Sequence, residues 1–510
     1  MSDELSPRES RLRKLGRMRE MGHDPFRVES FPRPYSAQEL LDGFEEGKRV
    51  EFAGRVVSFR LMGKAGFAHI SDGESRIQGY FKKDDLGEEA WELYTLLDLG
   101  DHVGVTGFLF ITKTGEKSIH VDSLTPISKA LQPLPLGKEK DGQVFSGLSD
   151  VDTRYRHRHL DLLANADVRQ TLIQRSKIVA AVRRYFDGAG YIEVETPMLQ
   201  LEAGGATARP FKTHYNAYEI DVKLRISLEL YLKRLICGDI PKVYEIGRVF
   251  RNEGLSNRHN PEFTLLEFYE AYVDMETMMR RVEECFRAVA VEVFGSTEVF
   301  CFGRPTDFGK PWNRVNLLEE IERLSGLTPH DLATLENAKH ALGHRQVVNP
   351  TTGKRISADD ENNLGGLIEK LLEVFVEPTL QDPTFVVGYP VETSPLAKKD
   401  PHNPRMTRRF EGYIAGREVC NAFSELNDPI DQRERFAAQV VEREKGDEEA
   451  HPMDEEFLYA VECGMPPTGG CGIGIDRMAM MLTGTEHIRE VLLFPFMRPE
   501  AKDTDEGREG

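Results

Sequence analysis

Two neighbouring runs of alternating residues constrain the fold of this chain more than any other feature. The runs "KVYEIGRVFRNE" and "PEFTLLEFYEAY" alternate apolar and polar positions, and a short polar loop, "GLSNRHN", joins them. Period-two patterns on both sides of such a loop predict a two-stranded hairpin. The chain is therefore expected to contain a β-sheet in which charged side chains gather on one hairpin.

One face of this hairpin combines charges with an aromatic wall. The residues that share faces by alternation are Phe263, Glu267 and Tyr269 on the second strand, and Arg251 and Glu253 on the first. A salt bridge on a solvated sheet face is the commoner explanation for a single Arg–Glu pair. Glu267 favours a polar pocket instead, because it lies between Leu265 and Tyr269 on a face that is otherwise expected to be buried.

The segments around the hairpin predict an α+β domain. Apolar residues recur at helical spacing up to Gly188, and "YIEVETPML" predicts a strand that ends at Pro197. Strands then predominate to Tyr272, helices fill much of 275–380, with a helical stretch at about 315–375, and strands return from "TFVVGYPVE" to "NAFSEL". Runs of strands separated by helical runs, without regular alternation, are typical of a largely antiparallel sheet with flanking helices.

A second charged hairpin is predicted in "RRFEGYIAGREVCNAFSELNDP". With a turn at Ala415-Gly416, Glu411 faces Cys420 and lies diagonal to Glu418 on the same face. Two such carboxylates suit Mg²⁺, which completes its shell with phosphate oxygens. By alternation Asn421, Phe423 and Glu425 point to the opposite face. If these three residues and the two glutamates all serve one site, the strand needs a bulge near Cys420. The alternative is two exposed glutamates on a surface hairpin.

A third segment, "TGGCGIGIDRMAMMLTG", predicts a glycine-rich strand that runs into a helix near Asp476. The alternate glycines allow a ligand to lie against the backbone, and Arg477 at the helix start adds a positive charge for phosphate. The pattern is weak as a bare GxG motif, and it lacks the spacing of a dinucleotide-binding fingerprint.

The N-terminal part predicts a different domain. From Val50 to about Thr125 there are about five short strands with one helix between the third and fourth, which favours a small closed barrel of the oligonucleotide-binding (OB) kind. The linker "LQPLPLGKEKDG" follows. The predicted divisions are a basic helix region at 1–35, the barrel at 36–150, a catalytic domain at 151–500 and an acidic tail at 501–510. The basic segment "RESRLRKLGRMRE" predicts either a solvated helix face or a phosphate-binding one.

Composition excludes several classes of protein. A net charge of -19 argues against a protein that coats nucleic acid by bulk charge. No apolar run has the length of a membrane span, and the first residues lack a secretory signal, so we expect a cytoplasmic protein with no membrane partner. The six cysteines form no CxxC pair and are expected to be buried thiols.

At these segments the sequence resembles the class II aminoacyl-tRNA synthetases, and among them the bacterial-type lysine enzymes. "GYIEVETPML", "GRVFRNEG...RHNPEFT" and "GIGIDRMAM" are similar to the three class motifs, in the right order, and "GGATARPF" and "ELYLKRL" are similar to lysyl-type signatures. The resemblance covers nearly the whole chain. It implies an N-terminal OB-fold barrel that reads the anticodon, a C-terminal class II antiparallel-sheet catalytic domain, a homodimer, and ATP-dependent attachment of L-lysine to tRNA(Lys) through a lysyl-adenylate, with Mg²⁺ as cofactor.

The resemblance also implies roles for individual residues around ATP. Arg251 would hold the α-phosphate and the substrate carboxylate, and Arg477 would clamp phosphate from the opposite side, which makes these two the catalytic residues. The other implied ATP ligands are Glu253 at the adenine amino group, His259 at the outer phosphates, Asn260, Phe263 under the adenine ring, and Glu411 and Glu418 through Mg²⁺.

The implied lysine site is acidic at both amino groups of the substrate. Glu425 and Tyr269 would take the ε-amino group, Glu229 and Gly205 the α-amino group, and Asn421 and Arg251 the carboxylate, with Glu267 and Phe423 in the same pocket. A neutral substrate side chain would leave the Glu425 charge unpaired and be rejected. In the barrel, Phe67 would stack on an anticodon base, Gln78 would bond its edge, and Arg60 and Glu116 would lie nearby.

Three alternatives to this reading can be named, and one departure from the family pattern. An aspartyl-type enzyme shares the motifs, but its substrate needs a cation where this chain has Glu229 and Glu425. A ligase that attaches lysine to a protein lacks the anticodon barrel, and a non-catalytic paralogue would have lost ATP or Mg²⁺ ligands. The departure is Leu228, which stands where the family usually has proline.

Overall fold

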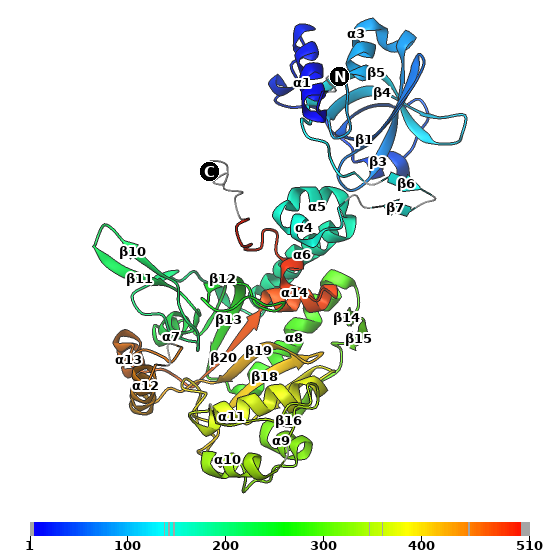
Figure 1. Ribbon diagram of the computed structural model, residues 1–510. Coiled ribbons are helices and arrows are strands. Elements are labelled where there is room, and N and C mark those ends of the chain that lie inside the picture. The colour runs from blue at the N-terminus through cyan, green and yellow to red at the C-terminus, as the bar shows by residue number, and fades with distance from the viewer. Residues whose placement is uncertain are drawn as a thin grey trace, which may run out of the picture. The chain divides into compact units, whose positions relative to one another are not determined.

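The computed structural model describes residues 5–136, 138–140, 143–145, 148–345, 347–359, 361–446 and 449–500 (Figure 1). The chain forms two compact units that meet in sequence between Asn165 and Ala166. Each unit has its own hydrophobic core. The predicted acidic tail at 501–510 lies outside the described residues.

The first unit contains the predicted OB-fold barrel. Its strands are β1 (Arg49–Met62), β2 (Ala65–Ser71), β3 (Arg76–Lys82), β4 (His102–Ile111) and β5 (Lys117–Ser128). They close in the order β1-β2-β3-β5-β4, with α3 (Lys83–Thr95) between β3 and β4 as predicted. Closure leaves no unpaired sheet edge, because the first and last strands of the order pair with each other.

The remaining elements of this unit are short. They are α1 (Pro7–Glu20), the 3-10 turn η1 (Pro25–Arg27), α2 (Ala37–Asp42), the hairpin β6 (Lys138–Lys140) and β7 (Gln143–Phe145), α4 (Val151–Arg156) and α5 (Arg158–Ala164). The basic segment forms α1, and most of its charges bind groups of the same unit. Arg11 donates to two backbone carbonyls, and Lys14 and Arg17 pair with Asp98 and Glu92. These contacts attach the helix to its own unit.

The second unit is built on an eight-stranded sheet. In sheet order the strands are β16 (Asn313–Asn316), β17 (Thr384–Val387), β18 (Arg409–Ile414), β19 (Arg417–Ser424), β20 (Thr468–Gly474), β13 (Glu262–Ala271), β12 (Lys242–Phe250) and β8 (Ile192–Glu193). All neighbours are antiparallel except the two outermost pairs. The predicted hairpin is β12 and β13, and the second charged hairpin is β18 and β19.

Helices and small sheets surround this central sheet. The helices are α6 (Ala166–Gly188), α7 (Glu229–Cys237), α8 (Met275–Phe294), α9 (Leu317–Ser325), α10 (Leu335–His344), α11 (Leu364–Leu371), the π-helical turn η2 (Leu372–Val376), the 3-10 turn η3 (Glu377–Thr379), α12 (Pro429–Glu444), α13 (Glu455–Glu462), α14 (Ile475–Thr483) and α15 (Ile488–Val491). The small sheets are β9 (Leu199–Gln200) with β10 (Lys212–Tyr215) and β11 (Ile220–Leu224), and β14 (Glu298–Cys301) with β15 (Arg304–Asp307).

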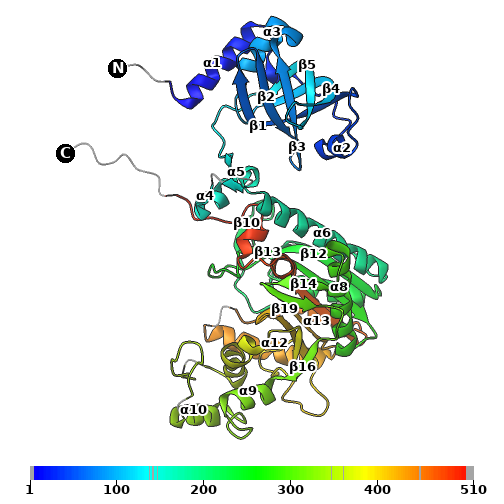
Figure 2. The same cartoon turned by 90° about the vertical axis from the view of Figure 1, so that its right-hand side faces the viewer.

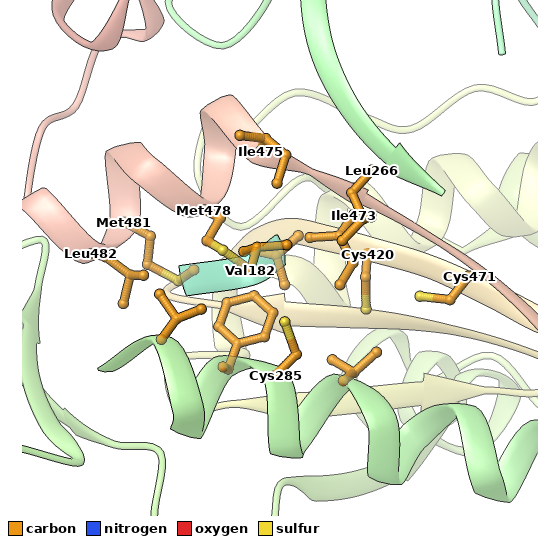
Figure 3. Packing of buried hydrophobic residues seen from close by; sticks show 14 of the residues in the cluster. Val182, Leu266, Cys285, Cys420, Cys471, Ile473, Ile475, Met478, Met481 and Leu482 are labelled. Carbon is orange, nitrogen blue, oxygen red and sulfur yellow. The ribbon is translucent and has the colours of Figure 1, made fainter. Parts of the chain in front are cut away.

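One face of the central sheet is covered by α6, α8 and α14, and Figure 2 shows α6 and α8 side by side. On β13 the alternation places Leu266 and Phe268 in this core and leaves Glu267 and Tyr269 for the other face. In Figure 3, Cys285 of α8 lies opposite Cys420 and Cys471 of the sheet. This packing leaves the second face of the sheet available for a site.

Three sequence predictions about the elements were wrong in detail. The run "YIEVETPML" contributes only Ile192 and Glu193 to the central sheet, because Thr196 then donates to the side-chain carboxylate of Glu245 on β12 instead of to a backbone carbonyl of that strand. The strands β14, β15 and β16 interrupt the stretch expected to be mostly helical. Finally, Cys463 is exposed, so not every cysteine is a buried thiol.

Candidate active site

A cavity of about 600 Å³ lies on the open face of the central sheet. Residues predicted for the site from distant parts of the sequence line it together. They are Gly205, Glu229, Arg251, Glu253, His259, Asn260, Phe263, Glu267, Tyr269, Glu411, Glu418, Asn421, Phe423 and Arg477. The three charged segments of the sequence thus form one site.

A β-bulge brings the second charged hairpin into this cavity. The chain turns at Ala415-Gly416 as predicted, but the pairing of β18 with β19 shifts by one residue between Gly412 and Tyr413. Glu411 therefore lies opposite Asn421 and not opposite Cys420, which corrects the predicted register. The extra residue on β19 is Val419, and it allows residues on both sides of the bulge to face the same cavity. The bulge near Cys420 is thus confirmed.

Glu425 is fully buried and is not among the residues that line the cavity, but its Oε1 lies against Gly470 and Tyr269, which do. Lys233 of α7 forms ion pairs with both Glu425 and Glu229 and is itself fully buried. The argument that a neutral substrate side chain would leave the Glu425 charge unpaired is therefore corrected, because Lys233 already pairs with this carboxylate. Sequence analysis missed Lys233, although its spacing of four residues from Glu229 in "ELYLKRL" places both on one helix face.

The glycines of β20 allow the floor of the cavity to form. A Cβ atom on Gly470 would lie 2.0 Å from Glu425 Oε1 and 2.4 Å from the Tyr269 ring. A Cβ atom on Gly472 would come no closer than 3.6 Å to a neighbouring side chain, Glu267. The strand must therefore lack a side chain at Gly470, whereas Gly472 has room for one.

Glu267 is held by three donors inside the cavity. It accepts hydrogen bonds from Ser227 Oγ at 2.7 Å, Leu228 N at 3.0 Å and Tyr269 Oη at 3.0 Å. Burial, and then the nearby Glu229, raise the pKa of Glu267 to about 7. Leu228, the departure noted in the sequence, thus supplies an N–H that a proline could not.

Positive groups gather on the other side of the cavity. The Arg251 guanidinium lies 5.2 Å from the centre of the Phe263 ring. Arg477 donates to Glu418 Oε2 at 2.7 Å, and its other nitrogen lies 3.3 Å from His259 Nε2. Burial, and then Arg477, lower the pKa of His259, so the imidazole is neutral at neutral pH. This region can accept a polyanion.

Arg409 joins the two carboxylate-rich parts of the site and was also missed. Its guanidinium donates to Asn421 Oδ1 at 3.0 Å and to Glu411 Oε1 at 2.6 Å. Glu411 accepts two further hydrogen bonds, from Tyr389 at 2.8 Å and Tyr413 at 2.6 Å. Glu369 of α11 lies 3.7 Å from Arg409, so the helical stretch at 315–375 contributes to the cavity wall. Arg409 could have been recognised from the sequence, because it stands two residues before Glu411 and therefore lies on the same face of the strand.

Comparison with known proteins decides the family. The model described as "tRNA synthetases class II (D, K and N)" matches residues 150–498, and the model "OB-fold nucleic acid binding domain" matches residues 50–127. The chain is 49% identical over 495 residues to the lysine–tRNA ligase of Syntrophomonas wolfei, covering 97% of each chain. It is 47% identical over 507 residues to the lysine–tRNA ligase of Bacillus subtilis, covering 98% of each chain. The chain belongs to the lysine–tRNA ligases, a family of class II tRNA synthetases.

The barrel of this synthetase carries the four residues predicted to read an anticodon. Phe67 on β2 is half-buried, with its ring 5.1 Å from that of Tyr80. Gln78 is buried, and its amide group donates to Glu116 at 2.7 Å and accepts from Ser118 at 2.9 Å. Arg60 lies directly opposite Phe67 on β1 and is exposed. The aromatic ring is thus accessible, whereas the Gln78 amide already has partners.

No helix among the described residues of this synthetase is long and apolar enough to cross a membrane.

Proposed function

We propose that this synthetase attaches L-lysine to tRNA(Lys) in two steps. The lysine carboxylate attacks the α-phosphate of ATP, which gives lysyl-adenylate and pyrophosphate. The terminal ribose 3′-hydroxyl of the tRNA then attacks the adenylate carbonyl and releases AMP. The observation that carries the proposal is one cavity that Glu229, Glu267, Arg251 and Arg477 line together.

The chain supplies binding and charge stabilisation in the first step. The attacking carboxylate is already ionised at neutral pH, so no protein base is needed. Arg251 holds the carboxylate and the α-phosphate, and Arg477 lies near the phosphates, so both stabilise the charge that develops during displacement. Phe263 and Glu253 then position adenine, with His259 and Asn260 on the phosphate side.

Glu411 and Glu418 are proposed to hold Mg²⁺. Their chemistry fits, because both are carboxylates that line the cavity, and donors from Tyr389, Tyr413 and Arg477 orient them. Among the described residues no group of three or more His, Cys, Asp or Glu side chains could hold a metal ion. This agrees with a cation that takes its remaining ligands from phosphate oxygens. The bound ion would neutralise phosphate charge.

The acidic end of the cavity is proposed to select lysine. Glu425 and Tyr269 receive the ε-ammonium group, Glu229 and Gly205 receive the α-ammonium group, and Asn421 positions the carboxylate. Glu267 and Phe423 complete the wall. An aspartate side chain would meet negative charge here, which disfavours the aspartyl alternative.

Lysine affinity is expected to increase as the pH rises from about 6 to 8. Below its pKa of about 7, Glu267 is protonated and contributes no charge to a bound ammonium group. Above that pH it is ionised and attracts the substrate. Titration calorimetry should show affinity rising by up to about tenfold per pH unit below 7 and levelling off above it, with proton release at the lower pH. Equal affinity at pH 6 and 8 would contradict the role of Glu267.

Replacing Arg409 by lysine is expected to raise both the lysine KM and the Mg²⁺ concentration for half-maximal activity, each by about tenfold. Arg409 bonds Asn421 and Glu411 through two different guanidinium nitrogens, and the single ammonium nitrogen of a lysine cannot reproduce the positions of both donors. Pyrophosphate exchange with each ligand varied in turn measures both constants. The control is Arg408→Lys, because Arg408 lies 3.9 Å from Asp400 and is partly exposed. A change in only one constant would show that Arg409 does not link the two sites.

A homodimer, anticodon contacts and a cytoplasmic location complete the proposal. The segment "GYIEVETPML" resembles the first class motif, which forms the dimer interface in the family, and its Ile192 and Leu199 are 54% and 52% exposed, which supports a second copy that covers them. Sedimentation measures whether the chain is a dimer in solution.

The accessible Phe67 ring supports stacking on an anticodon base. The proposed substrates favour a cytoplasmic enzyme.

The test of the function is ATP–pyrophosphate exchange with each of the twenty amino acids, without tRNA. We expect exchange with lysine alone. Exchange with aspartate or asparagine would overturn the pocket assignment but keep the class of enzyme. Exchange with none of them would favour a nucleic-acid-binding relative without adenylation activity, or an enzyme that requires tRNA first.

A further inference from the structure

Lys233 is buried directly behind the pocket that is proposed to bind lysine, where its ammonium group pairs with the lining residue Glu229. It is on α7 one turn after Glu229, and the chain just after β19 brings Glu425 against it. The side chains of Lys233 and Glu425 have no exposed surface. Lys233 Nζ also lies 5.2 Å from the centre of the Phe423 ring and 5.9 Å from that of Phe457. The ammonium group is therefore withdrawn from water and surrounded by carboxylates and aromatic faces.

The two oxygens of Glu425 have different surroundings. Oε2 is the atom paired with Lys233. Oε1 lies over Gly470, where an added Cβ atom would come within 2.0 Å of it, next to the Tyr269 ring. Gly470 and Tyr269 both line the cavity. One oxygen of the carboxylate is therefore held by the protein, while the other lies toward the substrate side.

Near neutral pH Glu267, with its pKa of about 7, changes its charge beside Lys233, whereas His451, Tyr269 and Cys237 do not. The groups that face this cluster besides Glu229 and Glu425 are Cys237 of α7, Glu267 and Tyr269 of β13, Arg409 of β18, and His451 before α13. Burial lowers the pKa of His451 to about 4 and raises the pKa of Tyr269 and Cys237, so these three are neutral. Arg409 is paired with Glu411. Three carboxylates and one ammonium group remain.

We propose that Lys233 is the built-in counter-ion of the amino-acid pocket. It neutralises one of the carboxylates of Glu229, Glu267 and Glu425, so that two net negative charges remain for the two ammonium groups of lysine. Lys233 is then a positioning residue, which acts on the substrate through Glu425. This inference rests on the proposed function, because it takes the pocket to be the lysine site.

The charge of Lys233 also favours the ionised form of Glu425. Burial raises the pKa of Glu425, and Lys233 opposes that effect. Without the ammonium group, Glu425 would take up a proton and lose the charge that attracts the substrate ε-ammonium group. Removing Lys233 should therefore weaken lysine binding in a pH-dependent way, whereas a purely structural role would weaken it equally at every pH.

The test measures lysine binding by calorimetry to the full-length protein and to Lys233→Met, between about pH 6 and 8.5. We expect the variant to bind lysine at least about tenfold more weakly than the wild type near pH 7, because one pKa unit corresponds to a tenfold change. The gap in lysine affinity between the variant and the wild type should narrow as the pH rises, because a higher pH favours loss of the proton from Glu425. Binding of 6-hydroxynorleucine, in which a hydroxyl replaces the ε-ammonium group, should weaken less than that of lysine.

Two further variants separate charge from structure. Lys233→Met/Glu425→Gln removes both partners, so it should fold, bind lysine weakly and show the same pH dependence as the wild type, in which Glu267 titrates. Lys242→Met removes a more exposed ion pair, Lys242–Glu270 at 2.8 Å, whose residues do not line the cavity, and should bind lysine like the wild type. The double variant also carries the test if the single variant does not fold.

Several outcomes would overturn the proposal. If Lys233→Met bound lysine more weakly than the wild type by the same factor at every pH, Lys233 would be a structural residue only. A double variant that does not fold would lead to the same conclusion. Lys233→Met is expected to show a pH dependence of lysine binding beyond that of the wild type. If the double variant kept this additional pH dependence, Glu425 would not be the group that titrates. If the wild-type protein does not bind lysine at all, the proposed function falls together with this inference.

Discussion

Glu425→Gln is expected to raise the lysine KM by about 100-fold and to leave the ATP KM within about twofold, a loss of about 3 kcal/mol that is confined to one substrate. Glu425 is fully buried, and its free oxygen lies beside Tyr269 at the acidic end of the cavity. A glutamine keeps the shape but removes the charge that compensates a buried ammonium group. Pyrophosphate exchange, with lysine and ATP varied in turn, measures both constants.

The matched control for this change is Glu442→Gln. Glu442 also lines the cavity, but it lies on α12 and pairs with Lys445 at 2.8 Å. We expect its effect on either KM to stay below about twofold, as for an exposed ion pair. If Glu425→Gln raised the ATP KM as much as the lysine KM, Glu425 would support the cavity as a whole and the assigned contact would be wrong.

Gly470→Ala is expected to abolish detectable lysine-dependent exchange. The added methyl group would lie 2.0 Å from Glu425 Oε1 and 2.4 Å from Tyr269, and the buried surroundings of both side chains leave them little room to move. Both groups are proposed to bind the ε-ammonium group, so their displacement removes the lysine site. Exchange activity and calorimetric lysine binding measure the loss, and ATP binding is expected to persist.

Gly472→Ala on the same face of β20 controls for folding. Its methyl group would meet Glu267 Cγ at 3.6 Å, an ordinary contact, so its melting temperature should stay within about 2 °C of the wild type. Gly470→Ala should melt lower but still fold, because the strain is local. Retention of lysine binding by Gly470→Ala would mean that Glu425 and Tyr269 can move aside without loss, and the assigned pocket geometry would be wrong.

Much of the cavity could be predicted because short-range patterns fix which face a side chain occupies. Alternation along β13 separates Glu267 and Tyr269 from the buried Leu266 and Phe268, and the glycine run identifies a strand that something must approach closely. The carboxylates of the second hairpin were recognised for the same reason. The bulge could be predicted only on the condition that both faces of the strand serve one site, because alternation alone places Glu418 and Asn421 on opposite faces.

Local period and motifs were enough to predict the family, the barrel, the antiparallel sheet and fourteen of the residues that line the cavity. How the charges are compensated depends on tertiary packing. Lys233 meets Glu425 although 192 positions separate them in sequence, and Arg409 meets both Asn421 and Glu411. Such pairs depend on where α7 packs and where β19 bulges, and packing between distant segments leaves no short-range pattern in the sequence.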